Sequence, residues 1–313
     1  MDEVRFDRMV PAQIVKRRNE KNVAFLPVGS LEWHGPHMPF GTDYMTVTHL
    51  AEEGARRFGG VAFPPVFYGD VRFILQECRV EWRESYCREM QVPEAFASVF
   101  PLQKADGTPG YDFFLAPDDG PPAADPMPFT YEEQKKFFAM LIAKSLLSIH
   151  LYGFRNIILL PGHGPNPEFC RMAEGIYRQN VARRKAFGEA ARTLTYVYFE
   201  AAKESEPLLK NHWIHADKWE GSLTMVAAPG TVHPEYLPRD PKTLVPAYLG
   251  TPYIHEREGY NPAYRHIWHS FDALDPRHMD EAYGRAQYEA ILKAFGETVR
   301  QQTAPEPAAP APA

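Results

Sequence analysis

Residues 23–43 read VAFLPVGSLEWHGPHMPFGTD, and this stretch decides both the fold class and the place of a site. Its first six residues, 23–28, are apolar throughout, which is typical of a strand buried in a parallel sheet. The remainder is too rich in Gly and Pro for a helix and carries two carboxylates and two imidazoles. Because open α/β sheets bind ligands just beyond the carboxyl ends of their strands, the stretch predicts an enzyme with a metal site.

Outward from this stretch, apolar runs alternate with amphipathic segments along the chain. The run at 157–160 is the strongest buried-strand signal, and the segment PGHGPN follows it directly. We expect strands at 23–28, 61–63, 157–160 and 194–199, and helices at 43–58, 130–153, 166–187, 223–228 and 276–301. Asp43 is expected to cap the first of these helices, and Thr130 to open the second. The alternation predicts an α/β fold with a mainly parallel sheet.

The composition is that of an ordinary globular protein, with 313 residues, 24% charged and 44% hydrophobic. A net charge of −6 without a basic stripe argues against nucleic acid as a partner. The three cysteines, Cys78, Cys87 and Cys170, form no disulfide framework and no C-x-x-C metal motif, which favours a reducing cytoplasm. No signal peptide and no stretch of about 20 apolar residues is present, so we expect no membrane association.

The chain is expected to form one domain over 1–303, followed by a disordered Pro/Ala-rich tail at 304–313. Residues 100–129 are rich in proline and form either a surface excursion or a lid or subunit contact. The region 250–270 is rich in aromatic residues and His. It either packs in the ordinary way or lines a pocket or an oligomer contact.

The first cluster of chemically capable residues is Glu32, His34 and Asp43. In an extended segment residues i and i+2 point to the same side, so Glu32 and His34 can reach one point. Asp43 can return to that point after the Gly/Pro turn. A mixed His/carboxylate set suits zinc, manganese or iron(II). The alternative is that Glu32 caps a turn and His34 is a satisfied core histidine.

Two further clusters follow later in the chain. His163 lies between two glycines that leave room for a ligand, although it could also be a structural turn histidine. His215 is a candidate proton shuttle, and Glu220 a candidate metal ligand or general base. Residues that flank these clusters are candidates for substrate contact, namely Trp33, His37, Asn166 and Trp219.

Together the clusters, in this order, resemble the creatininase (creatinine amidohydrolase) family. The stretch 26–43 is similar to the opening metal motif of that family. The segment 162–166 resembles the second motif, which is usually led by Asn where this chain has Pro161. The stretch 215–222 resembles the third. The resemblance covers roughly residues 20–230, apart from 100–129.

The resemblance implies a three-layer α/β/α sandwich, a homohexamer, and one or two divalent metals per subunit. In that family the metals activate water against an amide, often a cyclic one. By position, the resemblance makes Glu32, His34, Asp43 and His163 metal ligands, with Asp43 bridging if two metals bind. It makes His215 the proton-transfer residue, and it gives the second metal site a further carboxylate at Glu220.

The departures from the family pattern bear on the substrate. Creatininase carries a glutamate two residues after the second-motif histidine, where this chain has Pro165. We therefore expect a metal-dependent hydrolase of a non-peptide C–N bond, an amide in a small polar substrate other than creatinine. A lactonase, deformylase or sugar isomerase would need the same residues. A non-catalytic binding or maturation partner is the remaining alternative.

Overall fold

The computed structural model describes residues 3–32, 34–68, 131–206, 209, 215–237, 239 and 274–305. The elements run in the order η1 (Phe6–Arg8), α1 (Pro11–Glu20), β1 (Ala24–Val28), α2 (Thr42–Phe58), β2 (Val61–Ala62), α5 (Tyr131–Leu151), β3 (Asn156–Pro161), α6 (Asn166–Ala182), η5 (Lys185–Phe187), β4 (Arg192–Thr195), α7 (Tyr198–Ser205), α8 (Lys218–Ala227), η7 (Pro234–Tyr236), η13 (Pro276–His278) and α10 (Glu281–Thr303). The segments 100–129 and 250–270, the tail beyond Pro305, and Trp33 and Thr130 lie outside the described residues.

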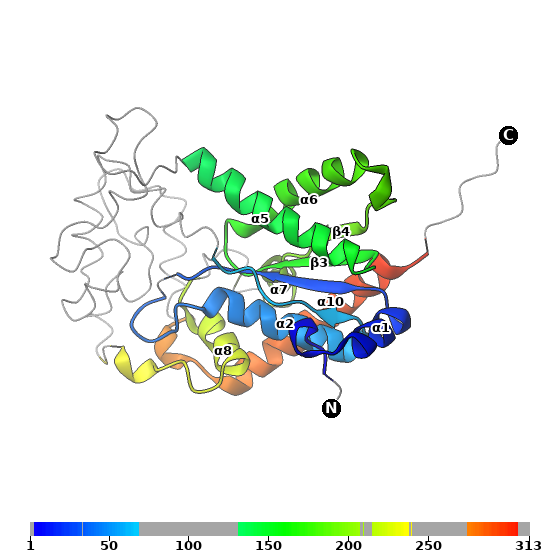
Figure 1. Cartoon of the computed structure of the whole chain (residues 1–313). Helices are drawn as coiled ribbons and strands as arrows, with labels where there is room; N and C mark the ends of the chain where they lie inside the picture. The colour runs from blue at the N-terminus through cyan, green and yellow to red at the C-terminus, as the bar shows by residue number, and fades with distance from the viewer. Residues whose placement is uncertain are drawn as a thin grey trace, which may run out of the picture.

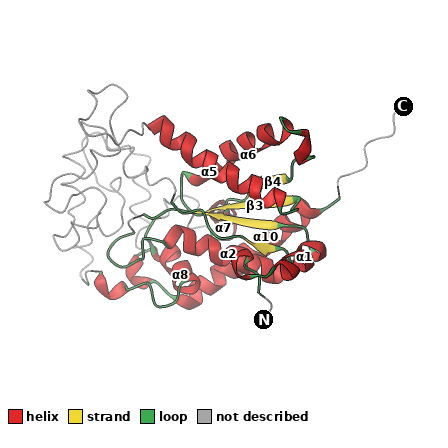
Figure 2. Cartoon of the chain, in the orientation of Figure 1, coloured by secondary structure: helices red, strands yellow, loops and turns green. Residues whose placement is uncertain are grey.

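Four parallel strands form one sheet in the order β2-β1-β3-β4. Helices cover both of its faces, with α5 and α6 on one side and α2, α8 and α10 on the other (Figures 1 and 2). The predicted α/β class and the three-layer arrangement are confirmed.

Side chains of the strands alternate between two cores, as the period of two in a strand requires. Phe25, Ile158 and Leu160 pack against the face covered by α2, α8 and α10. Leu26 and Leu159 pack against the opposite face, with residues of α5 and α6. Burial on both faces explains why the strand sequences are apolar runs rather than alternating ones.

The register brings the ends of β1 and β3 to the same level. Val28 pairs with Pro161, and the N–H of Gly162 donates a hydrogen bond to the oxygen of Val28 at 2.7 Å. The loops that follow these strands therefore start side by side at the carboxyl edge of the sheet, where such folds bind ligands.

Two predicted features differ from the observed ones. Asp43 does not cap α2, whose N-cap position is Gly41 without a side-chain bond; the Asp43 carboxylate turns into the site instead. The predicted strand 194–199 ends at Thr195, and α7 begins at Tyr198. Aromatic and β-branched residues favour a strand there, but tertiary packing overrides this propensity.

The other predicted helices are present with shifted ends. The helix expected at 223–228 begins at Lys218, because Asp217 caps it by accepting a hydrogen bond from the N–H of Glu220 at 3.0 Å. The helix expected at 276–301 begins at Glu281 after a separate 3₁₀ turn. No helix in the described ranges has both the length and the apolar composition that a membrane span requires.

Candidate metal centre

The loop after β1 brings Glu32 and His34 to one point, with His34 Nε2 3.9 Å from Glu32 Oε2. His34 Nδ1 lies 3.0 Å from the backbone oxygen of Glu32. Since a carbonyl oxygen only accepts, Nδ1 donates this bond, and Nε2 is the nitrogen that can bind a metal once it has lost its proton. Nε2 lies 3.4 Å from an oxygen of Asp43 and 3.5 Å from one of Glu220. A histidine oriented in this way by its second nitrogen is typical of a metal ligand.

Asp43 lies in the first turn of α2 between two imidazoles. Its Oδ1 faces His34, and its Oδ2 lies 3.3 Å from Nδ1 of His163. The hydroxyl of Ser30 donates a short hydrogen bond to Oδ2. The carboxylate is buried, and each of its two oxygens faces a different histidine.

His163 directly follows β3 and faces the same carboxylates. Its Nδ1 lies 3.0 Å from Glu32 Oε2. Its backbone N–H donates a hydrogen bond to Oδ1 of Asn166 at 3.2 Å. Asn166 is fully buried at the start of α6, so its amide shapes the loop that presents the histidine.

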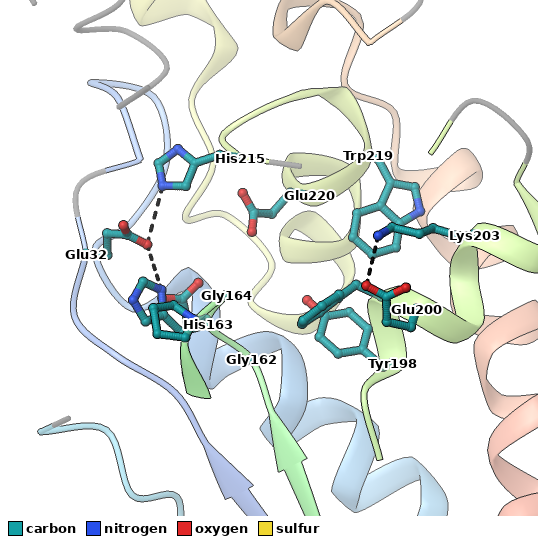
Figure 3. A pocket seen from close by; sticks show the side chains of 13 residues that line it. Glu32, Gly162, His163, Gly164, Tyr198, Glu200, Lys203, His215, Trp219 and Glu220 are labelled. Carbon is teal, nitrogen blue, oxygen red and sulfur yellow. Dashed lines mark hydrogen bonds and ion pairs between the residues drawn. The ribbon is translucent and has the colours of Figure 1, made fainter. Parts of the chain in front are cut away.

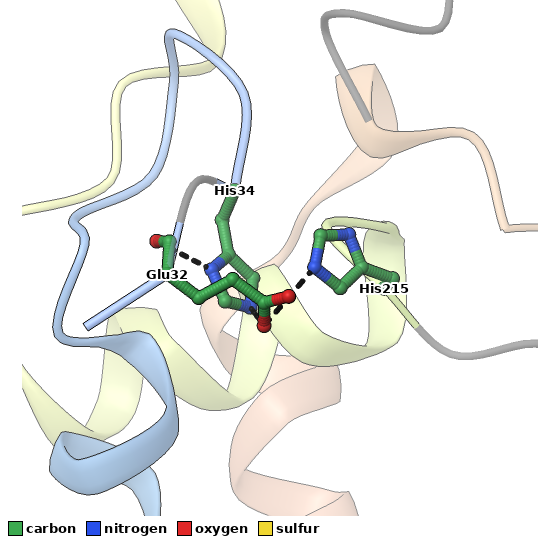
Figure 4. Close-up of side chains that lie close together, drawn as sticks. All are labelled: Glu32, His34 and His215. Carbon is green, nitrogen blue, oxygen red and sulfur yellow. Dashed lines mark hydrogen bonds and ion pairs between the residues drawn. The ribbon is translucent and has the colours of Figure 1, made fainter. Parts of the chain in front are cut away.

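The segment before α8 supplies His215, and the first turn of α8 supplies Glu220. His215 Nε2 lies 3.3 Å from Glu32 Oε2, and its ring stacks on that of His34 with centroids 4.4 Å apart. Figure 4 shows the Glu32 carboxylate close to both imidazoles. The N–H of Ala216 donates to Glu220 Oε2 at 2.6 Å, which holds the Glu220 carboxylate toward the site.

These six side chains form overlapping groups whose ligand atoms lie within 4.8 Å of one another. The groups are Glu32, Asp43 and His163; His34, Asp43 and Glu220; and Glu32, His34 and His215. The first two groups share Asp43. Two adjacent cation sites with one common carboxylate are therefore compatible with the side-chain positions.

The donor set fits a divalent cation. Three carboxylates are buried at one place, which costs free energy unless a positive charge compensates them. Glu32 Oε1 and His34 Nε2 are buried and make no hydrogen bond within the described residues. Mixed imidazole and carboxylate donors suit zinc, manganese and iron.

The imidazoles and carboxylates compensate one another in the protein without metal. Burial alone would lower the pKa of His163, but the Glu32 carboxylate raises it to about 10. Burial alone would raise the pKa of Glu32, but His163 and His215 hold it well below its ordinary value. Metal ligands must be deprotonated, so metal binding here is expected to release protons.

A pocket of about 340 Å³ opens on these residues. Its wall includes the five side chains of Glu32, Asp43, His163, His215 and Glu220, together with Gly162, Gly164, Pro165, Tyr198, Phe199, Glu200, Lys203 and Trp219. Figure 3 shows the α7 residues and Trp219 across the pocket from Glu32 and His163. The sequence reasoning missed the α7 residues because it assigned Tyr198 and Phe199 to a strand.

The four residues predicted to contact substrate differ in whether they line the pocket. Trp219 lines the pocket, whereas Trp33 is outside the described residues. The structure places His37 and Asn166 behind the pocket wall rather than in it. His37 is 1% exposed, and its Nε2 lies 3.2 Å from the oxygen of Ala216. His37 Nε2 and Asn166 Oδ1 bond backbone groups of the loops that carry the predicted ligands, whereas His37 Nδ1 and Asn166 Nδ2 make no hydrogen bond within the described residues.

The chain is similar to known proteins in sequence and in fold. The sequence model of the creatininase family, described as creatinine amidohydrolase, matches residues 7–74 and 120–299. A 3-dehydro-scyllo-inosose hydrolase from Thermotoga maritima is 39% identical over 66 residues, which are 21% of this chain and 21% of that protein. The chain thus matches about a fifth of the length of this relative.

Solved structures of creatininases share the fold. A crystal structure of creatinine amidohydrolase (creatininase) aligns with a TM-score of 0.60 at 16% identity, covering 97% of this chain and 100% of that one. A manganese form of creatininase gives the same values. The family match over most of the chain shows that this protein belongs to the creatininase (creatinine amidohydrolase) family.

Proposed function

We propose that the protein hydrolyses a non-peptide C–N bond, an amide and in particular a cyclic one, in a small polar substrate, with two divalent metals in each subunit. The observation that carries the proposal is the pair of ligand groups that share Asp43 at the wall of one pocket. Glu32, Asp43 and His163 would hold one metal. His34, Asp43 and Glu220 would hold the other, so that Glu220 supplies the carboxylate that Pro165 cannot.

A divalent metal at such a site polarises a carbonyl and makes water nucleophilic near neutral pH. The residues of this chain would orient the substrate and move protons. His215 lines the pocket and lies next to Glu32. We propose that its Nε2 delivers a proton to the leaving nitrogen. Glu220 acts as general base if it does not ligate a metal.

A second candidate follows from the relative in Thermotoga maritima. The 39% identity over 66 residues favours a hydrolase of a substrate related to 3-dehydro-scyllo-inosose. Lactone opening, deformylation and sugar isomerisation remain compatible with the same residues. Product analysis with cyclic amides, lactones, formamides, ketoses and inososes separates these reactions, because ring opening and isomerisation give different products.

The first experiment is elemental analysis of the purified protein as wild type, Glu220→Ala and Asp43→Asn. We expect two metals per subunit in the wild type, about one in Glu220→Ala, and a loss at both sites in Asp43→Asn. The control is Glu235→Ala, since Glu235 is an exposed carboxylate that bonds only His233 among the described residues. It should keep both metals.

The other results contradict specific parts of the proposal. One metal in both wild type and Glu220→Ala removes Glu220 from the ligand set and makes it a base. No metal in the wild type favours the non-catalytic alternative, in which the protein is a binding or maturation partner. The metals found also decide between zinc, manganese and iron.

We further propose that the protein is a homo-oligomer, a hexamer by analogy with its family, and that it works in the cytoplasm without a nucleic-acid or membrane partner. Light scattering on the eluting protein gives the number of 35.7 kDa chains in the particle. A monomer would contradict the assembly.

A further inference from the structure

The wall of the pocket opposite the predicted metal ligands comes from α7 and α8. It consists of Tyr198, Phe199, Glu200, Lys203 and Trp219 (Figure 3). None of the α7 side chains belongs to a predicted ligand group. Their polar atoms are therefore available to a substrate while the other wall holds metal.

Tyr198 has a hydroxyl without a partner. The residue is 2% exposed and lines the pocket, yet its hydroxyl makes no hydrogen bond to the described residues. Two other buried tyrosines bond protein groups: the Tyr288 hydroxyl donates to the oxygen of Thr46 at 3.1 Å, and the Tyr177 hydroxyl lies 2.6 Å from Nδ1 of His150. The Tyr196 hydroxyl, which lies outside the pocket wall, makes no hydrogen bond within the described residues. Because Tyr198, unlike Tyr196, lines the pocket, its hydroxyl can take a bound molecule as its hydrogen-bond partner.

The Tyr198 phenol keeps its proton. Burial raises its pKa well above the ordinary value. A neutral phenol can donate a hydrogen bond to an oxygen of the substrate. It cannot serve as a counter-charge for a cationic one.

The outer part of the same wall carries a salt bridge without net charge. Lys203 Nζ lies 2.8 Å from Glu200 Oε1. Among the described residues of the pocket wall, Lys203 is the one lysine or arginine. Glu200 already neutralises it, so the pair offers both donors and acceptors but little attraction for a carboxylate. Neighbouring hydroxyl groups on one molecule satisfy such a pair.

We propose that Tyr198, Glu200 and Lys203 form a subsite for the hydroxyl groups of an uncharged, polyhydroxylated ring, with Tyr198 donating a hydrogen bond directly to the substrate. This inference rests on the proposed function, because it assigns the outer part of the substrate whose reacting group would lie at the metals. A volume of about 340 Å³ suits a single small ring. The aromatic side chains of Phe199 and Trp219 supply apolar wall for the C–H faces of such a ring.

The test uses the full-length, metal-loaded protein and two probes, myo-inositol and cyclohexanecarboxylate. Myo-inositol is an uncharged hydroxylated ring, whereas cyclohexanecarboxylate is a charged ring without hydroxyls. Calorimetric titration or ligand-observed NMR gives both dissociation constants. We expect the wild type to bind myo-inositol more tightly than cyclohexanecarboxylate. Tyr198→Phe should raise the dissociation constant of myo-inositol about tenfold, which is the effect of losing one hydrogen bond. Lys203→Met should weaken it as well.

Tyr196→Phe is the matched control. Tyr196 lies two residues earlier, is buried, and has a hydroxyl without a hydrogen bond in the described structure, but it is not in the pocket wall. Its substitution should leave the affinity for myo-inositol unchanged. If the wild type and Tyr198→Phe bind myo-inositol with equal affinity, Tyr198 does not belong to the subsite.

Two further results overturn the substrate class. They are tighter binding of cyclohexanecarboxylate, and no binding of myo-inositol by the wild type at millimolar concentrations. Metal content is measured on every variant and should not change, because none of the substituted residues is a predicted ligand. Failure of the proposed function appears as missing metal in the wild type, whereas failure of this inference appears as unchanged or absent probe binding at full metal content.

Discussion

Ala216 is the one residue other than glycine with a positive φ among the described residues, at 51°. This conformation costs free energy for an L-residue and persists only where the surroundings hold it. Both polar groups of Ala216 are bonded: its N–H donates to the Glu220 carboxylate, and its oxygen lies 3.2 Å from Nε2 of His37. The unusual backbone therefore orients a predicted ligand, and His37 holds the backbone.

His37 acts in this arrangement as a neutral donor. Burial lowers its pKa to about 3, so the ring is uncharged at neutral pH. Because the Ala216 oxygen can only accept, Nε2 carries the proton. The substrate contact of His37 stays a prediction, and its bond to the Ala216 oxygen gives this residue a positioning role.

His37→Ala should therefore weaken metal binding at the Glu220 side without removing a ligand. Loss of a group that orients a ligand typically costs about 10–100-fold in metal affinity. Titration of the apoprotein with Mn²⁺ or Zn²⁺, followed by calorimetry, measures the change. His37→Gln retains an N–H donor and should restore part of the affinity. Equal affinities in wild type and His37→Ala would show that Ala216 needs no support from His37.

At the scale of elements, the crossing of β3 and α2 decides the geometry of the site. A Cβ placed on Gly162 would lie 2.1 Å from the backbone oxygen of Asp43, so only glycine allows the end of β3 to approach the start of α2 this closely. Gly164 is different, because a Cβ there meets nothing within 4 Å. The two glycines around His163 thus have different roles, although the sequence suggests one role for both.

This contrast predicts opposite results for two adjacent alanine substitutions. Gly162→Ala should lower the free energy of unfolding by about 1–3 kcal/mol through overpacking and should reduce metal content, because it separates Asp43 from His163. Gly164→Ala should stay within about 0.5 kcal/mol of the wild type and keep its metal. Denaturant unfolding and elemental analysis measure both quantities. Similar behaviour of the two variants would contradict the close crossing.

At the scale of the whole molecule, the site joins segments that are far apart along the chain. Glu32 and Asp43 follow β1, His163 follows β3, and His215 and Glu220 lie before and within α8. Because the ligands come from separate elements, a bound metal would link these elements to one another in the native state. Metal that binds only the folded protein stabilises it by about 2.7 kcal/mol at a free concentration one hundred times its dissociation constant.

Chelation should therefore lower the thermal unfolding midpoint by about 5 °C or more, given about 2–4 °C for each kcal/mol in large domains. Differential scanning calorimetry with EDTA, and again after Mn²⁺ or Zn²⁺ is restored, measures the shift. In Asp43→Asn the midpoint should hardly respond to chelator, since the shared ligand is gone. A midpoint in the wild type that is insensitive to chelator would mean that the buried carboxylates are stable without metal.

Much of the fold and the candidate metal ligands could be predicted from the sequence, whereas the α7 residues of the pocket wall could not. The apolar runs at 23–28 and 157–160 indicated the two central strands, since burial on both faces leaves no polar positions. The i, i+2 spacing placed Glu32 and His34 together, because that relation depends on the backbone of one short segment alone. The order of the three motifs then indicated the family.

Other features depend on contacts between distant segments, and only the tertiary structure decided them. The sequence offered Asp43 both as a helix cap and as a third ligand beside Glu32 and His34, and the register of β1 and β3 brings His163 to its other oxygen. Tyr198 had the composition of a strand, yet packing made it the first residue of α7 and a wall of the pocket. The sequence by itself determined which residues could bind metal, because that is a property of side-chain chemistry and local spacing. The tertiary structure decided which of them share a carboxylate and which side chains face them, because strand register and helix crossings set those distances.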